Sequence, residues 1–531
     1  MKRFVTAAFL SLSLAASAAD FRAEAIRAHM TFLASDLLEG RATGTRGYQI
    51  AAEYVAAQYA LAGLEPGVDG KWFQDVPFIQ TVADPASTVT IVRKGAAPLT
   101  LTIFDGFTSS GDPLREETRI EGEVVFAGFG VSAPDHRYDD YAGLDVKGKV
   151  VAIFPGAPKS FSNAVRAHYS STLNKVRMAA SRGAVGLIIL NSPEDAARSP
   201  WERSTRQARL GTMHWTDREG VVRGVAPSLS STVTFGLEST RNLLGSQANA
   251  IFRELESGKP RPRRLGVEAR IDLRSAHTRL TSPNVVGLLR GSDPELRNEY
   301  LVYSAHLDHL GITEPVDGDS INNGAFDNAS GIAVMIEIAR RFGSLPEPPG
   351  RSIIFLATTA EEKGLRGADY FANNPTVPLD ALVANINIDM LMMTHRTRDL
   401  VAIGSETSDL GEMASQVAAE MGIELTPDPF PEEVVFVRSD QYPFVQRGIP
   451  AIYVDSGYRA VDPDIDLHAV TKAWLRERYH SPKDDLQQPI DWSSALLIAE
   501  FDFRLGLAVA NRREPPGWKP DDFFGRTFGR R

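Results

Sequence analysis

Five short segments in the second half of the chain carry side chains of the kind that bind metal ions. They are residues 304–308 (Ser-Ala-His-Leu-Asp), 326–328 (Phe-Asp-Asn), 360–362 (Ala-Glu-Glu), 387–390 (Asn-Ile-Asp-Met) and 479–482 (Tyr-His-Ser-Pro). Together they offer two histidines and three carboxylates as ligands, with one further carboxylate beside them. Such a set can hold two zinc ions through a shared aspartate and still leave a free base. The chemistry that it indicates is the attack of water on an amide.

Each of these residues, taken alone, has a simpler explanation. A lone histidine after a strand is usually a hydrogen-bonded structural residue, and an aspartate before Asn-Ala-Ser-Gly usually caps a helix. A Glu-Glu pair is commonly a solvated helix start, which the helix dipole favours. The combination indicates a site, because His306, the Glu361-Glu362 pair and Asp389 each follow an apolar run. Side chains at the carboxyl ends of neighbouring parallel strands can converge in one crevice.

The region after about residue 281 alternates runs that predict strands and helices, which indicates an α/β domain with a largely parallel, twisted sheet flanked by helices. Strands are expected at residues 284–289, 300–305, 352–358, 382–388, 400–403 and 451–454. Helices are expected at residues 330–342, 365–373, 410–421, 441–447 and 492–511.

The first half of the chain has two different characters. Residues 21–64 show apolar spacing of three and four, which predicts two helical stretches around a glycine-rich joint at 39–44. Residues 78–276 instead contain short runs typical of strands, broken by Gly, Pro and Asp turns, with one predicted helix at 174–182. We therefore expect a second, β-rich domain between the two parts of the α/β domain.

Composition narrows the class of protein. The chain has 531 residues, 43% of them hydrophobic and 23% charged, which is ordinary for a globular protein of two or three domains. The formal net charge is −10, and no block of Lys and Arg interrupts the acidic balance, which argues against nucleic-acid binding. There is no cysteine, so an exported form would depend on core burial and on bound metal instead of disulfides.

Residues 1–19 have the pattern of a secretory signal peptide. A basic start (Lys2, Arg3) precedes a mostly apolar run that ends in small residues, so cleavage is expected near Ala18 or Ala19. We therefore expect an exported protein, periplasmic or secreted. Elsewhere the sequence has no stretch close to the roughly 20 uninterrupted apolar residues that a membrane span needs.

In their order and contexts, the ligand-type residues resemble those of the co-catalytic zinc aminopeptidases, which are relatives of glutamate carboxypeptidase and the transferrin receptor. The resemblance implies two zinc ions per chain. His306 and Asp389 would hold one ion, Glu362 and His480 the other, and Asp327 would bridge them. It also implies peptides as substrates.

The same resemblance gives roles to the residues around the ligands. Glu361 would be the general base, taking a proton from the attacking water that bridges the two zinc ions and later delivering it to the leaving amine. Asp308 would orient a ligand. Tyr479 would either donate a hydrogen bond to the developing oxyanion or serve only in packing. Arg438 is a candidate for holding the peptide or its carboxylate. His309 is expected either to support a metal ligand or to line the pocket.

The domain organisation also follows from the resemblance. Residues 20–100 and 277–512 would form the zinc peptidase domain in two pieces, and residues 101–276 an inserted region with a protease-associated (PA) domain. This insertion is expected to act on substrate access and not on chemistry. Residues 513–531 are expected to form an extended surface tail.

One position departs from the family pattern. Relatives often carry Ser-Asp-His before a Pro-Phe or similar pair, whereas residues 439–441 of this chain read Ser-Asp-Gln. The replaced histidine is not a metal ligand in the pattern, so Gln441 predicts altered pocket chemistry and not loss of metal.

Four functions can be compared with this set of residues. An aminopeptidase is favoured, because a metal pair at the bottom of a cleft suits a chain end. A carboxypeptidase of the same family would need cations for a terminal carboxylate, and Arg396, Arg398 and Arg438 are the nearby supply. A glutaminyl cyclase would normally use one metal and lack the insertion. A receptor-like binding protein would have lost ligands that this chain retains.

Overall fold

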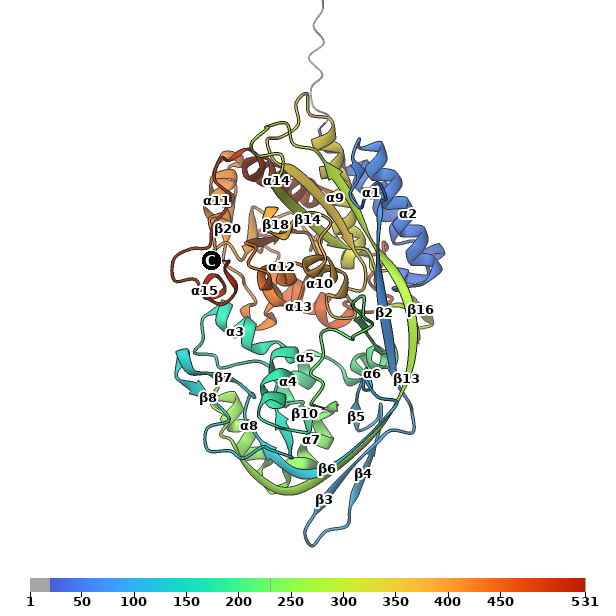
Figure 1. Ribbon diagram of the computed structural model, residues 1–531, viewed down its shortest axis with the longest axis vertical. Helices are drawn as coiled ribbons and strands as arrows, with labels where there is room; N and C mark the ends of the chain where they lie inside the picture. The colour runs from blue at the N-terminus through green and yellow to red at the C-terminus, as the bar shows by residue number, and fades with distance from the viewer. Residues whose placement is uncertain (1–19, 230, 531) are drawn as a thin grey trace, which may run out of the picture.

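The computed structural model describes residues 20–229 and 231–530, so the predicted signal peptide lies outside the described residues. The described chain forms two lobes that are joined by two long antiparallel strands (Figure 1). The upper lobe in Figure 1 contains the α/β sheet, and the lower lobe contains the β-rich insertion. The lower lobe also includes residues 88–100, which were expected in the peptidase domain but pair with the lower sheet. None of the helices in the described part has the length and apolar character that crossing a membrane requires.

The upper sheet has a parallel centre, where β17, β14, β18 and β21 lie side by side, and antiparallel pairs on both sides of it. This confirms the predicted fold class, an α/β protein with a large, mostly parallel sheet flanked by helices. In spatial order the strands are β11 (Thr212–Trp215), β2 (Phe73–Ala83), β13 (Arg263–Leu289), β17 (Ser352–Thr358), β14 (Tyr300–His306), β18 (Leu382–Asn387), β21 (Ala451–Ser456), β19 (Asp399–Ile403) and β20 (Glu424–Thr426), with β1 (Glu65–Pro66) beside the end of β13.

The central strands are buried on both faces because helices cover both sides of the sheet. In β14, Leu301 and Tyr303 face one layer, and Val302 faces the other. Continuous apolar runs of this kind are typical of parallel strands covered on both faces. The first layer contains α1 (Ala23–Leu33), α2 (Arg46–Leu61), α9 (Gly331–Gly343), α11 (Leu410–Met421) and α14 (Trp492–Asn511); the second contains α10 (Arg366–Asn373) and α12 (Gln441–Gln446).

The lower lobe has its own sheet and its own apolar core. Its strands lie in the order β4 (Leu99–Thr102), β3 (Thr88–Arg93), β13, β6 (Glu117–Phe126), β9 (Val150–Ile153), β10 (Gly186–Leu190), β12 (Thr232–Phe235) and β5 (Phe107–Thr108). Its helices are α3 (Asn163–Ser170), α4 (Thr172–Ser181), α5 (Pro193–Arg198), α6 (Trp201–Arg209), α7 (Leu237–Leu244) and α8 (Ala248–Glu256). Two small hairpins complete the β-structure, β7 (Ser132–Ala133) with β8 (Tyr138–Asp139), and β15 (Gly311–Val316) with β16 (Asp319–Asn322).

Strand β13 belongs to both sheets and is 27 residues long, whereas the sequence predicted a strand only at 284–289. Its first half alternates buried and exposed residues, as a strand with one covered face does. Its last eight residues are all buried, as in the centre of a covered sheet. The change of pattern within one strand hid its continuity, because each half resembles a separate element.

Other elements also differ from the sequence prediction, since of the six α-helices described in the lower lobe only α4 was predicted. Helix α13 (Leu467–Glu477) was not predicted, although it leads directly to His480. The tail was expected to be an extended surface segment, but it includes helix α15 (Phe523–Phe528), and Phe524 is fully buried against Phe436. The tail is therefore not purely extended, because this aromatic side chain packs into the upper lobe.

Candidate metal centre

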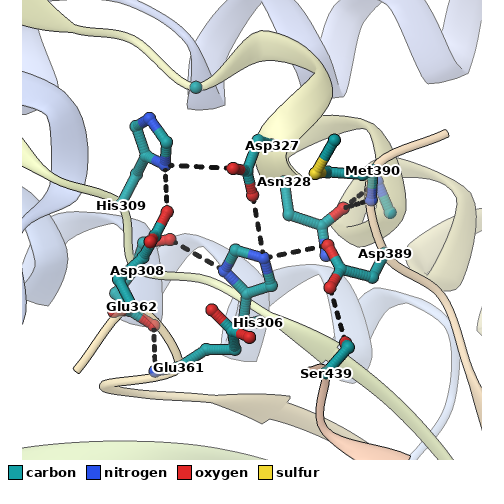
Figure 2. A network of polar contacts seen from close by, with 12 residues as sticks. His306, Asp308, His309, Asp327, Asn328, Glu361, Glu362, Asp389, Met390 and Ser439 are labelled. Atoms are coloured by element: carbon teal, nitrogen blue, oxygen red, sulfur yellow. Dashed lines mark hydrogen bonds and ion pairs between the residues drawn. The ribbon is translucent and has the colours of Figure 1, made fainter. Parts of the chain in front are cut away.

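The site begins where the central parallel strands end. His306 is the last residue of β14, Glu361 and Glu362 follow β17, and Asp389 follows β18. Because β14 pairs in register with both neighbours, these ends lie at one level and their side chains converge (Figure 2). The convergence at strand ends is the arrangement predicted from the sequence.

The first group of ligand atoms surrounds His306. Its Nε2 lies 3.0 Å from Asp389 Oδ1 and 3.1 Å from Asp327 Oδ1. Its Nδ1 lies 3.0 Å from the main-chain oxygen of Asp308, which fixes the ring with Nε2 toward the carboxylates. These three side chains offer one nitrogen and two oxygen ligands within a few ångströms of each other.

The second group shares Asp327. His480 Nε2 lies 3.2 Å from Asp327 Oδ2 and 3.1 Å from Glu362 Oε2. His309 also reaches this group, with its Nδ1 2.7 Å from Glu362 Oε1 and 3.9 Å from Asp327 Oδ2. His309, expected to lie beside a ligand or in the pocket, contacts the ligand carboxylates themselves (Figure 2). Its position next to Asp308 was the only signal available.

The side chains in the two groups fit a metal pair. Asp327 and Glu362 have side chains only 4% exposed, and their like charges would repel in a dry site unless cations or protons neutralise them. Burial lowers the pKa of His480, but Glu362 and Asp327 outweigh that effect and raise it to about 9. His309 Nδ1 lies close to Glu362 Oε1, but the geometry is not that of a hydrogen bond. The two ring nitrogens of His309 and this carboxylate oxygen are therefore buried without a hydrogen-bond partner among the described residues. Nitrogen and carboxylate donors around a shared aspartate suit zinc.

The neighbours Glu361 and Glu362 have different surroundings. Glu362 faces His480 and His309, whose charges outweigh burial and hold its pKa well below the usual range. No hydrogen bond or ion pair of the Glu361 carboxylate is found among the described residues. Burial raises the pKa of Glu361 well above its usual value; His306 opposes this shift, and the carboxylates of Asp389 and Glu362 add to it. Of these two neighbours, Glu361 is therefore the one whose carboxylate has no partner among the described residues.

The buried side chain of Asp484 holds the loop that carries Asp327. Asp484 accepts hydrogen bonds from the backbone N–H groups of Phe326 and Asp327, each at 3.0 Å. Because Asp484 is four residues after His480, it ties the two loops of the second group together. The sequence offered no signal for this residue, since the contact spans about 160 positions.

Arg41, from the joint between α1 and α2, holds three loops at once. Its guanidinium donates to the main-chain oxygens of Leu307 at 3.0 Å, Asn323 at 2.6 Å and Gly324 at 3.0 Å, and also to that of Leu33. The side chain is 1% exposed, and burial lowers its pKa to about 10, so it stays charged at neutral pH. Arg41 thus supports the loops that carry His306 and Asp327 without touching either.

Asp308 acts on the general-base candidate more directly than on a ligand. Its carboxylate accepts hydrogen bonds from the backbone N–H of Glu361 and from the Thr43 hydroxyl, each at 3.0 Å. The contact with His306 comes from its main-chain oxygen. The main-chain oxygen of Asp308 thus faces the ligand His306, whereas its carboxylate, which was expected to orient a ligand, fixes the strand end that presents Glu361.

Gln441 corrects an expectation. It was expected to alter pocket chemistry, but it is fully buried: it accepts a hydrogen bond from Asn387 at 2.8 Å and donates one to the oxygen of Phe436 at 2.9 Å. Asn387 also donates to Ser439, whose hydroxyl donates to Asp389. The amide of Gln441 therefore supports the loop of Asp389 from behind, because both its polar atoms are used within the lobe.

Tyr479 and Arg438 lie at the mouth of the site. The Tyr479 ring stacks on His480 at a centroid distance of 3.7 Å, and burial raises the pKa of its hydroxyl, which therefore keeps its proton. Arg438 Nη1 pairs with Glu433 at 3.1 Å, and its Nη2 lies 3.5 Å from the Tyr479 hydroxyl. Both side chains line the clefts described next.

The metal-site residues open into clefts between the two lobes. One cleft of about 570 Å³ is lined by Asp327, Glu361 and Asp389 from the upper lobe and by residues of α6 from the lower lobe. A larger cleft of about 1210 Å³ also reaches Glu361, together with Glu362. The site is thus accessible from solvent, and both lobes form its walls.

Comparison with known proteins agrees with this geometry. Residues 284–504 match the family model described as "Peptidase family M28", and residues 120–220 match the model described as "PA domain". The chain carries an M28 peptidase domain. A PA domain lies within its insertion, so the family resemblance inferred from the sequence is confirmed.

Curated relatives match parts of the chain. "Aminopeptidase NAALADL1" of Mus musculus is 36% identical over 132 residues, which are 23% of this chain and 16% of the relative. "Aminopeptidase YwaD" of Bacillus subtilis (strain 168) is 26% identical over 230 residues, 41% of this chain and 43% of the relative. The chain spans half or less of the length of each of the first curated relatives that it matches.

A solved structure shares the fold of the whole chain. "Aminopeptidase from Aneurinibacillus sp. strain AM-1" superposes with a TM-score of 0.53 at 20% sequence identity, covering 94% of this chain and 97% of the other. The likeness extends over both lobes, so the arrangement of an α/β domain with a β-rich insertion is common to the two proteins.

Proposed function

We propose that this chain is an exported aminopeptidase that depends on two zinc ions and releases N-terminal residues from peptides. The observation that carries the proposal is the pair of buried ligand groups that share Asp327, with the unpaired carboxylate of Glu361 beside them. Relatives named as aminopeptidases and zinc metalloproteases, together with the M28 match, support the same class.

In this proposal the two groups divide the metal ligands. His306 and Asp389 would hold one ion, Glu362 and His480 the other, and Asp327 both. Bound zinc would polarise the scissile carbonyl and lower the pKa of a water molecule. The same positive charge would lower the raised pKa of Glu361, so that its carboxylate could accept the proton of that water and later deliver it to the leaving amine.

The residues at the mouth would act on the substrate. Tyr479 keeps its proton and could donate a hydrogen bond to the oxyanion that develops at the scissile carbonyl. Arg438 would contact the peptide while remaining paired with Glu433. His309 would hold Glu362 in position and would not bind zinc, because His480 approaches both carboxylates within 3.2 Å whereas His309 stays 3.9 Å from Asp327.

Bound-metal analysis tests the metal assignment. Protein purified without chelator should contain about two zinc ions per chain. At a free zinc concentration of 100 times Kd, binding should stabilise the fold by about 2.7 kcal/mol per site. His480→Ala should lose one ion, because it removes a ligand nitrogen, whereas His309→Ala should keep two. Retention of both ions by His480→Ala would reverse the roles of the two histidines, and a wild-type chain without zinc would support the receptor-like alternative.

The cleft favours an N-terminal over a C-terminal substrate end. Arg396 and Arg398, the cations that a carboxypeptidase would need, line neither cleft. Among the described residues, five Lys and Arg side chains line the 570 Å³ cleft, and two of them, Arg198 and Arg438, are both paired with Glu433. Carboxyl groups such as that of Asp428 line the same cleft and suit an ammonium group.

Blocking the substrate amine should therefore impair cleavage. A charge-assisted hydrogen bond contributes about 1.5–3 kcal/mol, so N-acetylation of a short peptide should lower kcat/KM by about 10- to 100-fold. Amidation of the C-terminus of the same peptide is the control and should have little effect. The exopeptidase proposal fails if the acetylated and free peptides are cleaved equally well, and a selective loss with the amidated peptide would indicate a carboxypeptidase.

Export is proposed from the composition of residues 1–19 alone. N-terminal sequencing of protein recovered from the periplasm or medium of a bacterial host should give a start near Asp20. A chain that keeps Met1 in those fractions would contradict a cleaved signal.

For the insertion, the position of both clefts between the lobes supports a role in substrate access.

A further inference from the structure

Helix α6 of the PA domain reaches across to the metal centre. Arg203 donates from Nη1 to the main-chain oxygen of Leu475 at 2.9 Å and from Nη2 to that of Arg476. These oxygens belong to the last turn of α13, where helix carbonyls lack partners within the helix. Four residues further along α6, the Gln207 amide contacts Nδ1 of His480. Residues four apart lie on one face of a helix, so one face of α6 holds both α13 and the ligand loop.

Other contacts fix both ends of α6, to the lower lobe, to β15 and to the joining strand β2. Trp201 donates from its indole N–H to the oxygen of Asp105 at 3.0 Å. Arg209 pairs with Glu314 at 3.1 Å, and Gln80 of β2 donates to the oxygen of Leu210 at 3.4 Å. These contacts at both ends of the helix mean that Gln207 is presented by a fixed element and not by a free loop.

The two ligand histidines are supported in different ways. His306 Nδ1 faces the main-chain oxygen of Asp308, within the M28 domain. His480 Nδ1 instead faces a side chain of the PA domain, about 270 positions earlier in the chain. A metal-binding histidine almost always donates its second ring N–H to an oxygen, and loss of that partner typically weakens metal affinity by about 10–100-fold.

We propose that Gln207 is a positioning residue for the metal centre, and that the PA domain thereby completes one of the two zinc sites. The inference rests on the proposed metal centre. With Nε2 of His480 directed at Glu362 and Asp327, the Nδ1 atom carries the proton and donates it in a hydrogen bond. The structure places Gln207 Nε2 beside Nδ1. An amide turned over has the same shape, and in that orientation its oxygen accepts the Nδ1–H bond. The insertion thus contributes to metal binding as well as to substrate access.

Zinc affinity measured by competition with a chromophoric chelator tests this without relying on activity. Gln207→Met keeps the side-chain length but cannot accept the N–H bond well, so one of the two zinc affinities should fall by about 10–100-fold and the other should stay. Gln207→Glu should restore the affinity, because a carboxylate oxygen accepts the same bond. Glu202→Ala is the matched control, since this exposed residue on α6 should change neither affinity.

The variants separate this inference from the proposed function. His480→Ala should lose one zinc ion; if it keeps both, the metal assignment itself is wrong. If His480→Ala loses zinc while Gln207→Met keeps both affinities, only the positioning role is overturned. Failure of Gln207→Glu to restore binding would also overturn it, because the effect would then come from packing. Thermal unfolding of the zinc-free variants at equal midpoints confirms that the fold is unchanged.

Discussion

Glu361→Gln should lower kcat by about 10²–10⁴-fold with little change in KM, while the protein keeps two zinc ions. The substitution keeps the size and polarity of the side chain but removes the basic oxygen, and general acid–base catalysis contributes a factor of this order. Zinc should stay because the Glu361 carboxylate has no partner among the described ligand atoms. The measurement is steady-state kinetics on an unblocked peptide, with zinc content determined on the same sample.

Glu362→Gln is the matched variant, one residue away with the same chemical change. Its carboxylate lies 3.1 Å from His480 Nε2 and 2.7 Å from His309 Nδ1, so its loss should weaken one metal site. Activity should fall with zinc content and recover in part in excess zinc. The two roles are reversed if Glu361→Gln loses zinc and Glu362→Gln does not.

Arg41→Met should lower the free energy of unfolding of the zinc-free protein by about 3–5 kcal/mol. The substitution removes a buried positive charge and leaves four main-chain oxygens without their donor, and such losses are among the costliest single changes. Denaturant unfolding in the presence of chelator measures the effect without the contribution of bound metal.

Arg46→Met is the control for this prediction. Arg46 is an exposed arginine at the start of α2, and its replacement should stay within about 0.5 kcal/mol of the wild type. Equal stabilities of the Arg41 and Arg46 variants would mean that the guanidinium of Arg41 does not hold the site loops. Zinc affinity of Arg41→Met should also fall, because the loops of His306 and Asp327 lose a shared support.

The metal-type residues could be predicted because strand ends are a local signal. An apolar run followed by His306, Glu361 or Asp389 is visible in the sequence, and parallel topology brings such ends together. The residues that support them could not be predicted in this way. Arg41 meets its loops across more than 260 positions, and Asp484 meets Asp327 across more than 150. A buried arginine on main-chain oxygens leaves no pattern in its neighbours.

Contacts between residues far apart in the sequence also explain where the sequence predictions were wrong. Gln441 was expected in the pocket because its motif was compared with that of relatives, but its burial depends on Asn387 and on the chain at Phe436. Helix α13 was not predicted, although the chain reaches His480 three residues after this helix ends. The contact of Gln207 with His480 joins two domains, and no sequence pattern records a contact between surfaces that meet only after both have folded.

The shared strand β13 has a consequence for how the two lobes are joined in the polypeptide. The chain leaves the upper lobe at the end of β2 and returns along β13, where Ala83 lies directly opposite Ser275. Two chain crossings that are adjacent and antiparallel can be closed by a short hairpin turn, so an insertion at such a place can be removed with little change to the host sheet. The insertion would take the edge strand β11 with it, but not the strands that present His306, Glu361 and Asp389. It is not separable from the last turn of α13 or from Nδ1 of His480, since Arg203 and Gln207 would leave with it.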